Sequence, residues 1–138
     1  MDSDSFLASR LDRGAAPLAV GDVVVILGLL TFGALQHNTA AFLTENPAYL
    51  LGIYAPFLIG WILVAPLIGA YAPGAAESAK SSVPLVVRSW VPAAVVGLLL
   101  RWGGAFHGGA APAFAVVITV TGAVALGVWR YVYFKVRG

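Results

Sequence analysis

The chain has 138 residues, of which 60% are hydrophobic and 10% are charged, and its formal net charge at pH 7 is +2. A soluble domain of this length keeps a large share of its surface in water and cannot bury so much apolar surface. The composition therefore excludes a soluble enzyme and a disordered chain, and it predicts an all-α integral membrane protein. The small, scattered positive charge does not indicate a nucleic-acid partner, and the absence of cysteine excludes disulfides and thiolate metal sites.

Residues 1–16 precede the first apolar run and contain the charged residues Asp2, Asp4, Arg10, Asp12 and Arg13. Within this segment, residues 5–11 place apolar side chains on one face of a short helical turn. This pattern predicts either an interfacial anchor or a frayed terminus. Gly14 is expected to stop the turn and Pro17 to start the next helix. The acidic beginning of the chain disfavours a cleaved signal peptide, which would start with basic residues.

Long charge-poor runs predict four spanning helices, because a helix needs about 20 mostly apolar residues to cross the hydrocarbon core. The runs are apolar on every side, whereas the strands of an outer-membrane barrel alternate apolar and polar residues. We therefore expect an antiparallel bundle of four transmembrane helices within one domain, residues 17–131, followed by a basic tail at residues 132–138. The expected helices cover about residues 17–36, 49–71, 83–102 and 112–131.

The basic residues predict the orientation of this bundle. All eight lysines and arginines except Arg101 fall on the side of the two termini. By the positive-inside rule both termini are expected in the cytoplasm, and the chain is expected to be a multi-pass protein of the plasma membrane. Trp129 and the aromatic residues that follow it lie beside the cations of the tail, as in an interfacial aromatic belt.

The second expected helix contains two internal prolines, Pro56 and Pro66. Each removes a hydrogen bond and frees a carbonyl one turn earlier, on Gly52 and Ile62, which needs a new partner in hydrocarbon. Trp61, near the middle of this helix, also needs an acceptor for its indole N–H. We expect a kinked helix packed at the centre of the bundle, with a flexing element or a pocket wall as the functional alternative.

Several short motifs, taken in order, carry a family resemblance. They are Asp22, PFLIGW at 56–61, VGLLLR at 96–101, FAVV at 114–117 and WR at 129–130. In their order and spacing the chain resembles an uncharacterised family of small prokaryotic membrane proteins, domain-of-unknown-function family 3054, over nearly its whole length after Pro17. The resemblance implies a polytopic membrane protein without an assigned activity and a haloarchaeal or actinobacterial source.

Charges inside the expected spans are the first candidate site. Asp22 and Arg88 have opposite sign, and each is expected about 7–8 Å below the cytoplasmic start of its helix. A charge in the bilayer usually faces the bundle interior and is often paired, so we expect Asp22 to contact Arg88, with Arg130 as the substitute partner. Three alternatives stay open, namely side chains that reach the headgroups, a structural ion pair, and a proton- or ion-handling site.

A second polar group is expected at the opposite, extracytoplasmic end of the bundle. It comprises Gln36, His37, Arg101 and His107, with Glu45 nearby. The spacing of the histidines and the glutamate does not place them on one helix, so we expect no metal site and a solvated surface. Arg101 is expected either to reach outward or to hold an anion or a lipid headgroup.

The sequence offers no catalytic constellation and no phosphate-binding fingerprint, so we expect neither an enzyme nor a bound cofactor. One hypothesis is a small transporter or channel-like protein that uses an Asp22/Arg88 site. Four short helices leave little room for a pathway, so this role requires an oligomer, most simply a homodimer. The alternative is a non-transporting accessory or structural protein that binds lipid, an isoprenoid or a larger complex.

Overall fold

The computed structural model describes residues 10–137, and this part of the chain is all-helical. Four helices are long and apolar enough to cross a membrane, which confirms the expected number of long helices. The elements in chain order are η1 (Arg13–Ala15), α2 (Ala16–Leu35), α3 (Ala40–Glu45), α4 (Pro47–Ile68), η2 (Pro73–Ala76), α5 (Ala79–Trp102) and α6 (Pro112–Arg137).

The start of α2 follows the turn chemistry expected from the sequence. Pro17 lies in the first turn of α2, and Gly14 lies in the 3-10 turn η1 directly before it. The side chain of Asp12 caps this turn by accepting a hydrogen bond from the Gly14 N–H, at 3.1 Å. The helical turn expected over residues 5–11 lies mostly outside the described residues.

Three helices differ from the sequence prediction by three residues or more at one end, and the first of them, α4, ends at Ile68 instead of residue 71. The segment 132–137 was expected to be a tail, but it continues α6 to Arg137 because no glycine or proline interrupts it before the last residue. Helix α5 begins at Ala79 instead of residue 83, because Ser78 acts as its N-cap by accepting a hydrogen bond from the Ser81 N–H.

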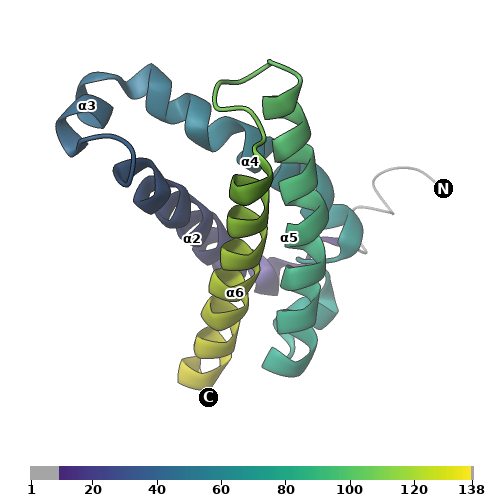
Figure 1. The fold of residues 1–138 in the computed structure, drawn as a ribbon. Coiled ribbons are helices and arrows are strands. Elements are labelled where there is room, and N and C mark those ends of the chain that lie inside the picture. Colours follow the sequence, from purple (N-terminus) through teal and green to yellow (C-terminus); the bar gives the residue numbers. More distant parts are fainter. Residues whose placement is uncertain (1–9, 138) are drawn as a thin grey trace.

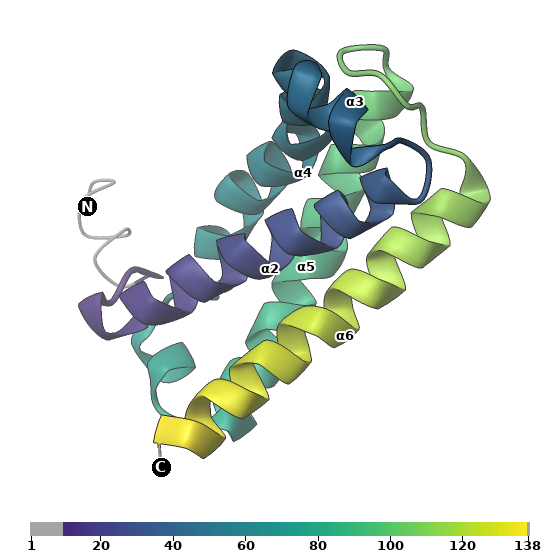
Figure 2. The same ribbon diagram turned by 90° about the vertical axis from the view of Figure 1, so that its left-hand side faces the viewer.

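Helix α5 is central to the packing, since it lies along both α4 and α6, whereas α2 packs mainly against α6. The beginning of α2 and the end of α6 lie at the same end of the bundle (Figure 2). Toward the opposite end, which carries α3, α2 leans away from α6 (Figure 1). The bundle is thus closed at one end and spread at the other.

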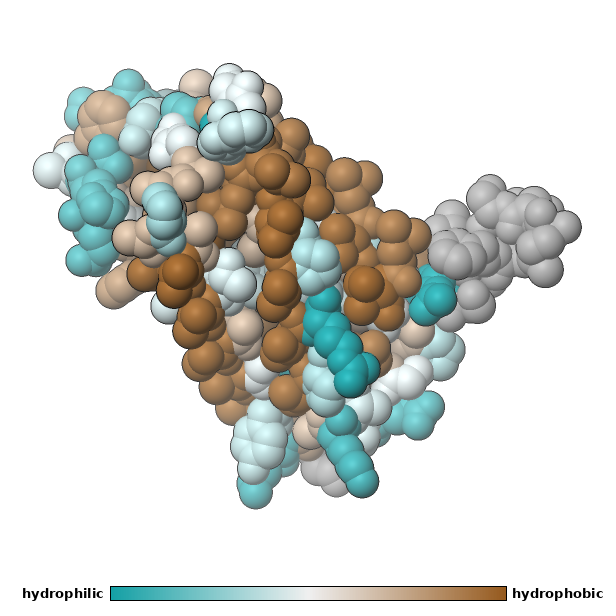
Figure 3. All heavy atoms as spheres, turned by 45° about the vertical axis from the view of Figure 1, so that its right-hand side comes forward, coloured by the Kyte–Doolittle hydropathy of each residue, from teal (hydrophilic) through white to brown (hydrophobic). Residues whose placement is uncertain are grey.

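The outer surface of the bundle is apolar. Apolar side chains cover the middle of the face shown in Figure 3, and hydrophilic ones gather toward its two ends. The side chains of Val24 on α2 and Ile62 on α4 are 62% and 69% exposed. Apolar residues in such number on the outside of a helix are expected where the helix faces lipid.

Glycines allow α5 to approach both of its neighbours closely. A Cβ on Gly60 of α4 would overlap the backbone carbonyl oxygen of Ala93 on α5. On the other side, a Cβ on Gly122 of α6 would overlap the indole of Trp90. That indole donates a hydrogen bond of 3.1 Å to the carbonyl of Thr119. Close helix contacts of this kind are the expected source of association where no hydrophobic effect drives it.

The connection between α4 and α5 lies against the segment that precedes α2. Helix α4 ends at Gly69, whose φ of 104° turns the chain sharply. Tyr71 follows and forms an isolated parallel bridge with Leu11. The Asp12 N–H donates a 2.7 Å hydrogen bond to the Tyr71 carbonyl, so the N-terminal segment holds this connection in place.

We expect Gly60→Ala to lower the free energy of unfolding by about 1–3 kcal/mol, because the new methyl group would force α4 away from the backbone of α5. Thermal unfolding in a mild detergent measures the loss. Gly28→Ala on α2 is the matched control, since nothing lies within 4 Å of a Cβ there. Equal stability of the two variants would contradict the close α4–α5 contact.

Candidate functional site

The first candidate site is a buried polar cluster at the closed end of the bundle. Helix α2 buries every fourth residue, and Asp22 belongs to this stripe. Helix α6 buries a corresponding stripe that ends with Arg130. The helix period therefore turns both charged side chains inward. The full set, called here the Asp22 cluster, comprises Asp22, Trp61, Tyr71, Ser82, Trp129 and Arg130.

Asp22 and Arg130 form a fully buried ion pair. Two nitrogens of the guanidinium, Nη2 and Nε, donate to the two carboxylate oxygens, the second over 3.3 Å. This two-point contact matches the planar fork of arginine to the carboxylate and fixes their relative orientation. The remaining Arg130 nitrogen, Nη1, donates to the Ala70 carbonyl at 3.0 Å and to the Ser82 hydroxyl at 3.1 Å.

Two aromatic side chains complete the hydrogen bonding of the Asp22 carboxylate. The Tyr71 hydroxyl donates to Oδ2 at 2.8 Å, and the Trp129 indole donates to Oδ1 at 3.0 Å. The indole of Trp61 in turn donates to the Tyr71 hydroxyl at 2.8 Å. Because a buried charge is tolerated only when it is paired and hydrogen-bonded, this arrangement explains how Asp22 can lie inside an apolar bundle.

Tyr71 is a donor that does not titrate in the physiological range. Burial raises the pKa of its hydroxyl well above its usual range, and the negative charge of Asp22 raises it further. Tyr71 therefore keeps its proton and its hydrogen bond to Asp22. The side chains of Asp22 and Arg130 are both fully buried. The Asp22 cluster is thus suited to holding helices together.

The prediction that Asp22 contacts Arg88 is wrong, because the ion-pair partner of Asp22 is Arg130. Arg88 is exposed on the surface of α5, whereas Val86 and Trp90 are buried. At 3.6 residues per turn, Arg88 points about 160° away from either of these residues, so its charge has the expected sign but its side chain lies on the wrong face of the helix. Arg130, expected as the substitute, is the partner of Asp22.

The sequence did not lead us to expect Tyr71 and Ser82 in this cluster, or the hydrogen bond from Trp129 to Asp22. Tyr71 was expected to end a helix, but the chain leaves the helix at Gly69 and brings the hydroxyl to Asp22. Ser82 lies four residues before Val86 on the buried face of α5, a signal that the sequence did contain. Trp129 was expected in an aromatic belt, yet its indole N–H faces Asp22.

The expectations for the second long helix are met in part. Trp61 is 2% exposed and packs inside the bundle, as expected for a central helix. Pro56 is buried and Pro66 is half-buried, and both lie within α4. The acceptor of the Trp61 indole is the Tyr71 hydroxyl. A bend of α4 at either proline stays a prediction.

The second candidate site is a cavity of about 540 Å³ at the spread end of the bundle. The four polar residues expected at this end, Gln36, His37, Arg101 and His107, all line it, and Glu45 does not. We call it the Arg101 cavity. Most of its wall is apolar, including Leu29, Leu30, Phe32, Ile53, Phe114, Val117 and Ile118 from α2, α4 and α6.

Arg101 is held in the wall of this cavity by an aromatic ring and a glycine loop. Its guanidinium carbon lies 4.2 Å from the centre of the Phe114 ring and 5.9 Å from that of Phe57. On its other side it contacts Gly108, whose φ is 106° and where a Cβ would overlap Nη2 of Arg101. The Nε atom of Arg101 is buried and has no hydrogen-bond partner among the described residues.

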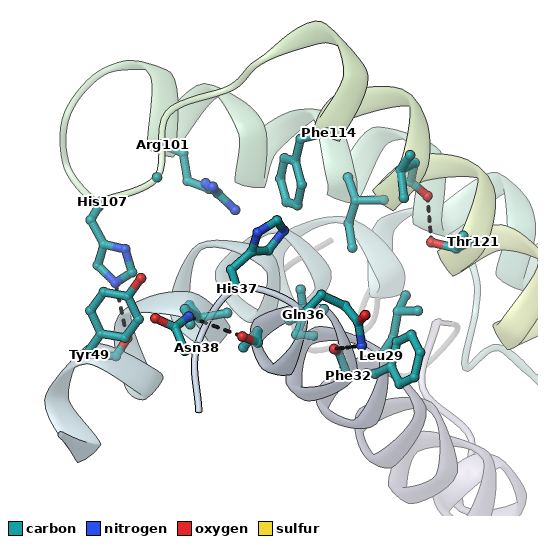
Figure 4. A pocket seen from close by; sticks show the side chains of 17 residues that line it. Leu29, Phe32, Gln36, His37, Asn38, Tyr49, Arg101, His107, Phe114 and Thr121 are labelled. Carbon is teal, nitrogen blue, oxygen red and sulfur yellow. Dashed lines mark hydrogen bonds between the residues drawn. The ribbon is translucent and has the colours of Figure 1, made fainter. Parts of the chain in front are cut away.

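Two other polar residues of the Arg101 cavity, His107 and Asn38, have hydrogen-bond partners close by. The ring of His107 stacks on Tyr49 with centroids 4.3 Å apart, and its Nε2 lies 3.1 Å from the Tyr49 carbonyl. Asn38 donates to the Ala34 carbonyl at 3.1 Å. Figure 4 shows His37 and Arg101 around the same hollow, beside Phe114. Residues 10–137 contain no group of histidine and acidic side chains that is placed to hold a metal ion.

Comparison with known proteins gives one match. The family described as "Protein of unknown function (DUF3054)" matches residues 19–133, a range that contains the whole Asp22 cluster and all the lining of the Arg101 cavity. This match confirms the resemblance seen in the sequence motifs. No curated protein and no solved structure matches the chain.

We expect Asp22→Ala to lower the free energy of unfolding by about 3–5 kcal/mol, because it leaves Arg130 charged and buried without its partner. The double variant Asp22→Ala/Arg130→Ala should recover part of this loss, since no isolated charge then remains. Thermal unfolding of the detergent-extracted protein measures both changes and their coupling.

Arg88→Ala serves as the control for this cycle, because it removes the same side-chain type from an exposed position. Its effect should stay within about 0.5 kcal/mol. If the effects of the Asp22 and Arg130 substitutions simply add, the ion pair does not stabilise the fold.

Proposed function

The chain belongs to the DUF3054 family, and we propose that it is a multi-pass protein of the plasma membrane that binds one amphiphilic molecule in the Arg101 cavity. The observation that carries this proposal is the polarity of the cavity along its length. Its walls between α2 and α6 are apolar apart from Thr121, whose hydroxyl donates to the Val117 carbonyl. Its other polar residues lie at the end near α3 and the α5–α6 loop. An amphiphile matches this distribution, with its tail between the helices and its headgroup at the polar end.

The size and position of the cavity also support binding. A volume of about 540 Å³ falls within the range of ordinary ligand pockets, about 300–1,000 Å³. Residues of both α2 and α6 line the cavity, and we propose that a molecule from the surrounding bilayer enters it between these two helices. A bound molecule would also fill space that the side chains leave open.

The geometry favours binding over transport through the Asp22 site. A proton- or ion-handling carboxylate needs contact with water or with the transported species. Asp22 is instead fully buried and accepts hydrogen bonds from Tyr71, Trp129 and Arg130. We therefore assign the Asp22 cluster a structural role and the Arg101 cavity the binding role, without catalysis.

The proposed orientation places both termini in the cytoplasm, because every lysine and arginine except Arg101 lies toward their side of the bundle. It follows that the Arg101 cavity faces the extracytoplasmic leaflet.

A reporter that is active only in the cytoplasm tests this orientation. Fused to Gly138 it should give signal, and inserted at Asn46, between α3 and α4, it should not, because the two sites lie on opposite sides of the bilayer. The reverse pattern would place the cavity at the cytoplasmic leaflet.

We expect Gly33→Leu to reduce binding of an amphiphile, because Gly33 lines the Arg101 cavity and a larger side chain would occupy part of it. Native mass spectrometry of the full chain with dioleoyl phosphatidic acid or dioleoylglycerol as probe measures the bound fraction.

Gly28→Leu is the matched control for this experiment. It lies on the same helix, a Cβ there also meets nothing within 4 Å, and it does not line the cavity. Its binding should equal that of the unmodified chain. Failure of both probes to bind the unmodified chain, or equal loss in both variants, would contradict the proposed function.

A further inference from the structure

We propose that the molecule bound in the Arg101 cavity carries an anionic oxyacid headgroup, a phosphate or a carboxylate, which the Arg101 guanidinium binds. This inference rests on the proposed function and names the class of amphiphile that the cavity selects.

The first argument is the missing counter-charge. Arg101 lies in the wall of a mainly apolar cavity, and no aspartate or glutamate is among the described residues that line it. Its Nε is buried without a hydrogen-bond acceptor in this part of the chain. The contrast with Arg130 is clear, because the latter donates to Asp22, Ser82 and the Ala70 carbonyl. A buried N–H donor without an acceptor is costly, and an anionic ligand would supply the acceptor that the protein lacks.

The second argument is that the guanidinium is held in place before any ligand binds. Phe114 packs against the guanidinium carbon from one side and Gly108 packs against it from another. Neither of these neighbours uses the N–H groups of Arg101 as hydrogen-bond donors. A fixed planar fork with free donors binds carboxylate or phosphate at two points and loses little entropy in doing so.

The third argument concerns the surroundings of the headgroup position. His37 faces the same hollow as Arg101 (Figure 4). The side chain of Gln36 donates only one long hydrogen bond of 3.4 Å, to the Phe32 carbonyl. These two side chains from the end of α2 are available as further donors to an oxyanion. A cationic headgroup would meet the positive charge of Arg101 and no negative one, so the charge of the wall selects against it.

The test compares two probes with the same tails, dioleoyl phosphatidic acid and dioleoylglycerol, on the full chain in detergent. We expect the unmodified chain to bind the phosphatidic acid more tightly by about tenfold to a hundredfold, the factor expected for hydrogen bonds to a charged group. Arg101→Gln should abolish this preference, because the substitution removes both the charge and the guanidinium fork. Arg101→Lys keeps the charge without the fork and should retain part of the preference.

Arg88→Gln is the control, because it removes the same charge from the exposed face of the same helix and should leave the preference intact. If Arg101→Gln does not fold, the comparison of the two probes on the unmodified chain still decides the question. Equal binding of both probes would overturn the anionic headgroup and leave the proposed function standing.

Inorganic phosphate provides the remaining arm of the test, because it carries the headgroup chemistry without a tail. Stabilisation by phosphate alone, lost in Arg101→Gln, together with no binding of either lipid, would support an anion at Arg101 and overturn the amphiphile. Absence of binding by all three probes would overturn both the headgroup and the proposed function.

Discussion

A charged side chain is stable in the interior of an apolar bundle only when it is paired and hydrogen-bonded. The buried ion pair between Asp22 and Arg130 therefore determines how the elements at the closed end of the molecule are arranged. The pair joins the beginning of α2 to the end of α6. Its remaining hydrogen bonds recruit Ser82 from α5 and Tyr71 from the α4–α5 connection. All four long helices, or the segments that follow them, are therefore fixed to one buried centre.

The spread end of the bundle follows from the same constraint. Because α2 is fixed to α6 near Asp22, the two helices can separate only toward α3, and the Arg101 cavity lies in that space. Two arginines of the bundle, the buried Arg130 and the partly exposed Arg101, have different surroundings. Arg130 has a carboxylate and serves the fold, whereas Arg101 has aromatic and glycine neighbours and keeps an unmatched donor.

The sequence predicts the helices well and the contacts between them only in part. Charge-poor runs predict the four long helices, and the cost of a buried charge correctly demands a cation for Asp22. The helix period would have preferred Arg130 over Arg88, because Arg130 lies four residues after the buried Leu126 whereas Arg88 lies opposite Trp90. Tyr71 was not predictable from periodicity, since its position depends on the turn at Gly69 and on the bridge to Leu11. Likewise, Gln36, His37, Arg101 and His107 were expected at one end, but only the fold brings them around one cavity.

The order in which the ion pair is synthesised has a consequence for the assembly of the protein. Asp22 and Arg130 are separated by 108 residues. At about 5–20 residues per second, the ribosome delivers the cation roughly 5–20 s after the carboxylate. During that interval Asp22 lacks its partner Arg130. Tyr71 is synthesised before Trp129 and Arg130, so it is the first of the described hydrogen-bond donors to Asp22 to become available. A nascent chain that stops before its last helix therefore carries Asp22 on its first helix without the cation that pairs with it in the finished bundle.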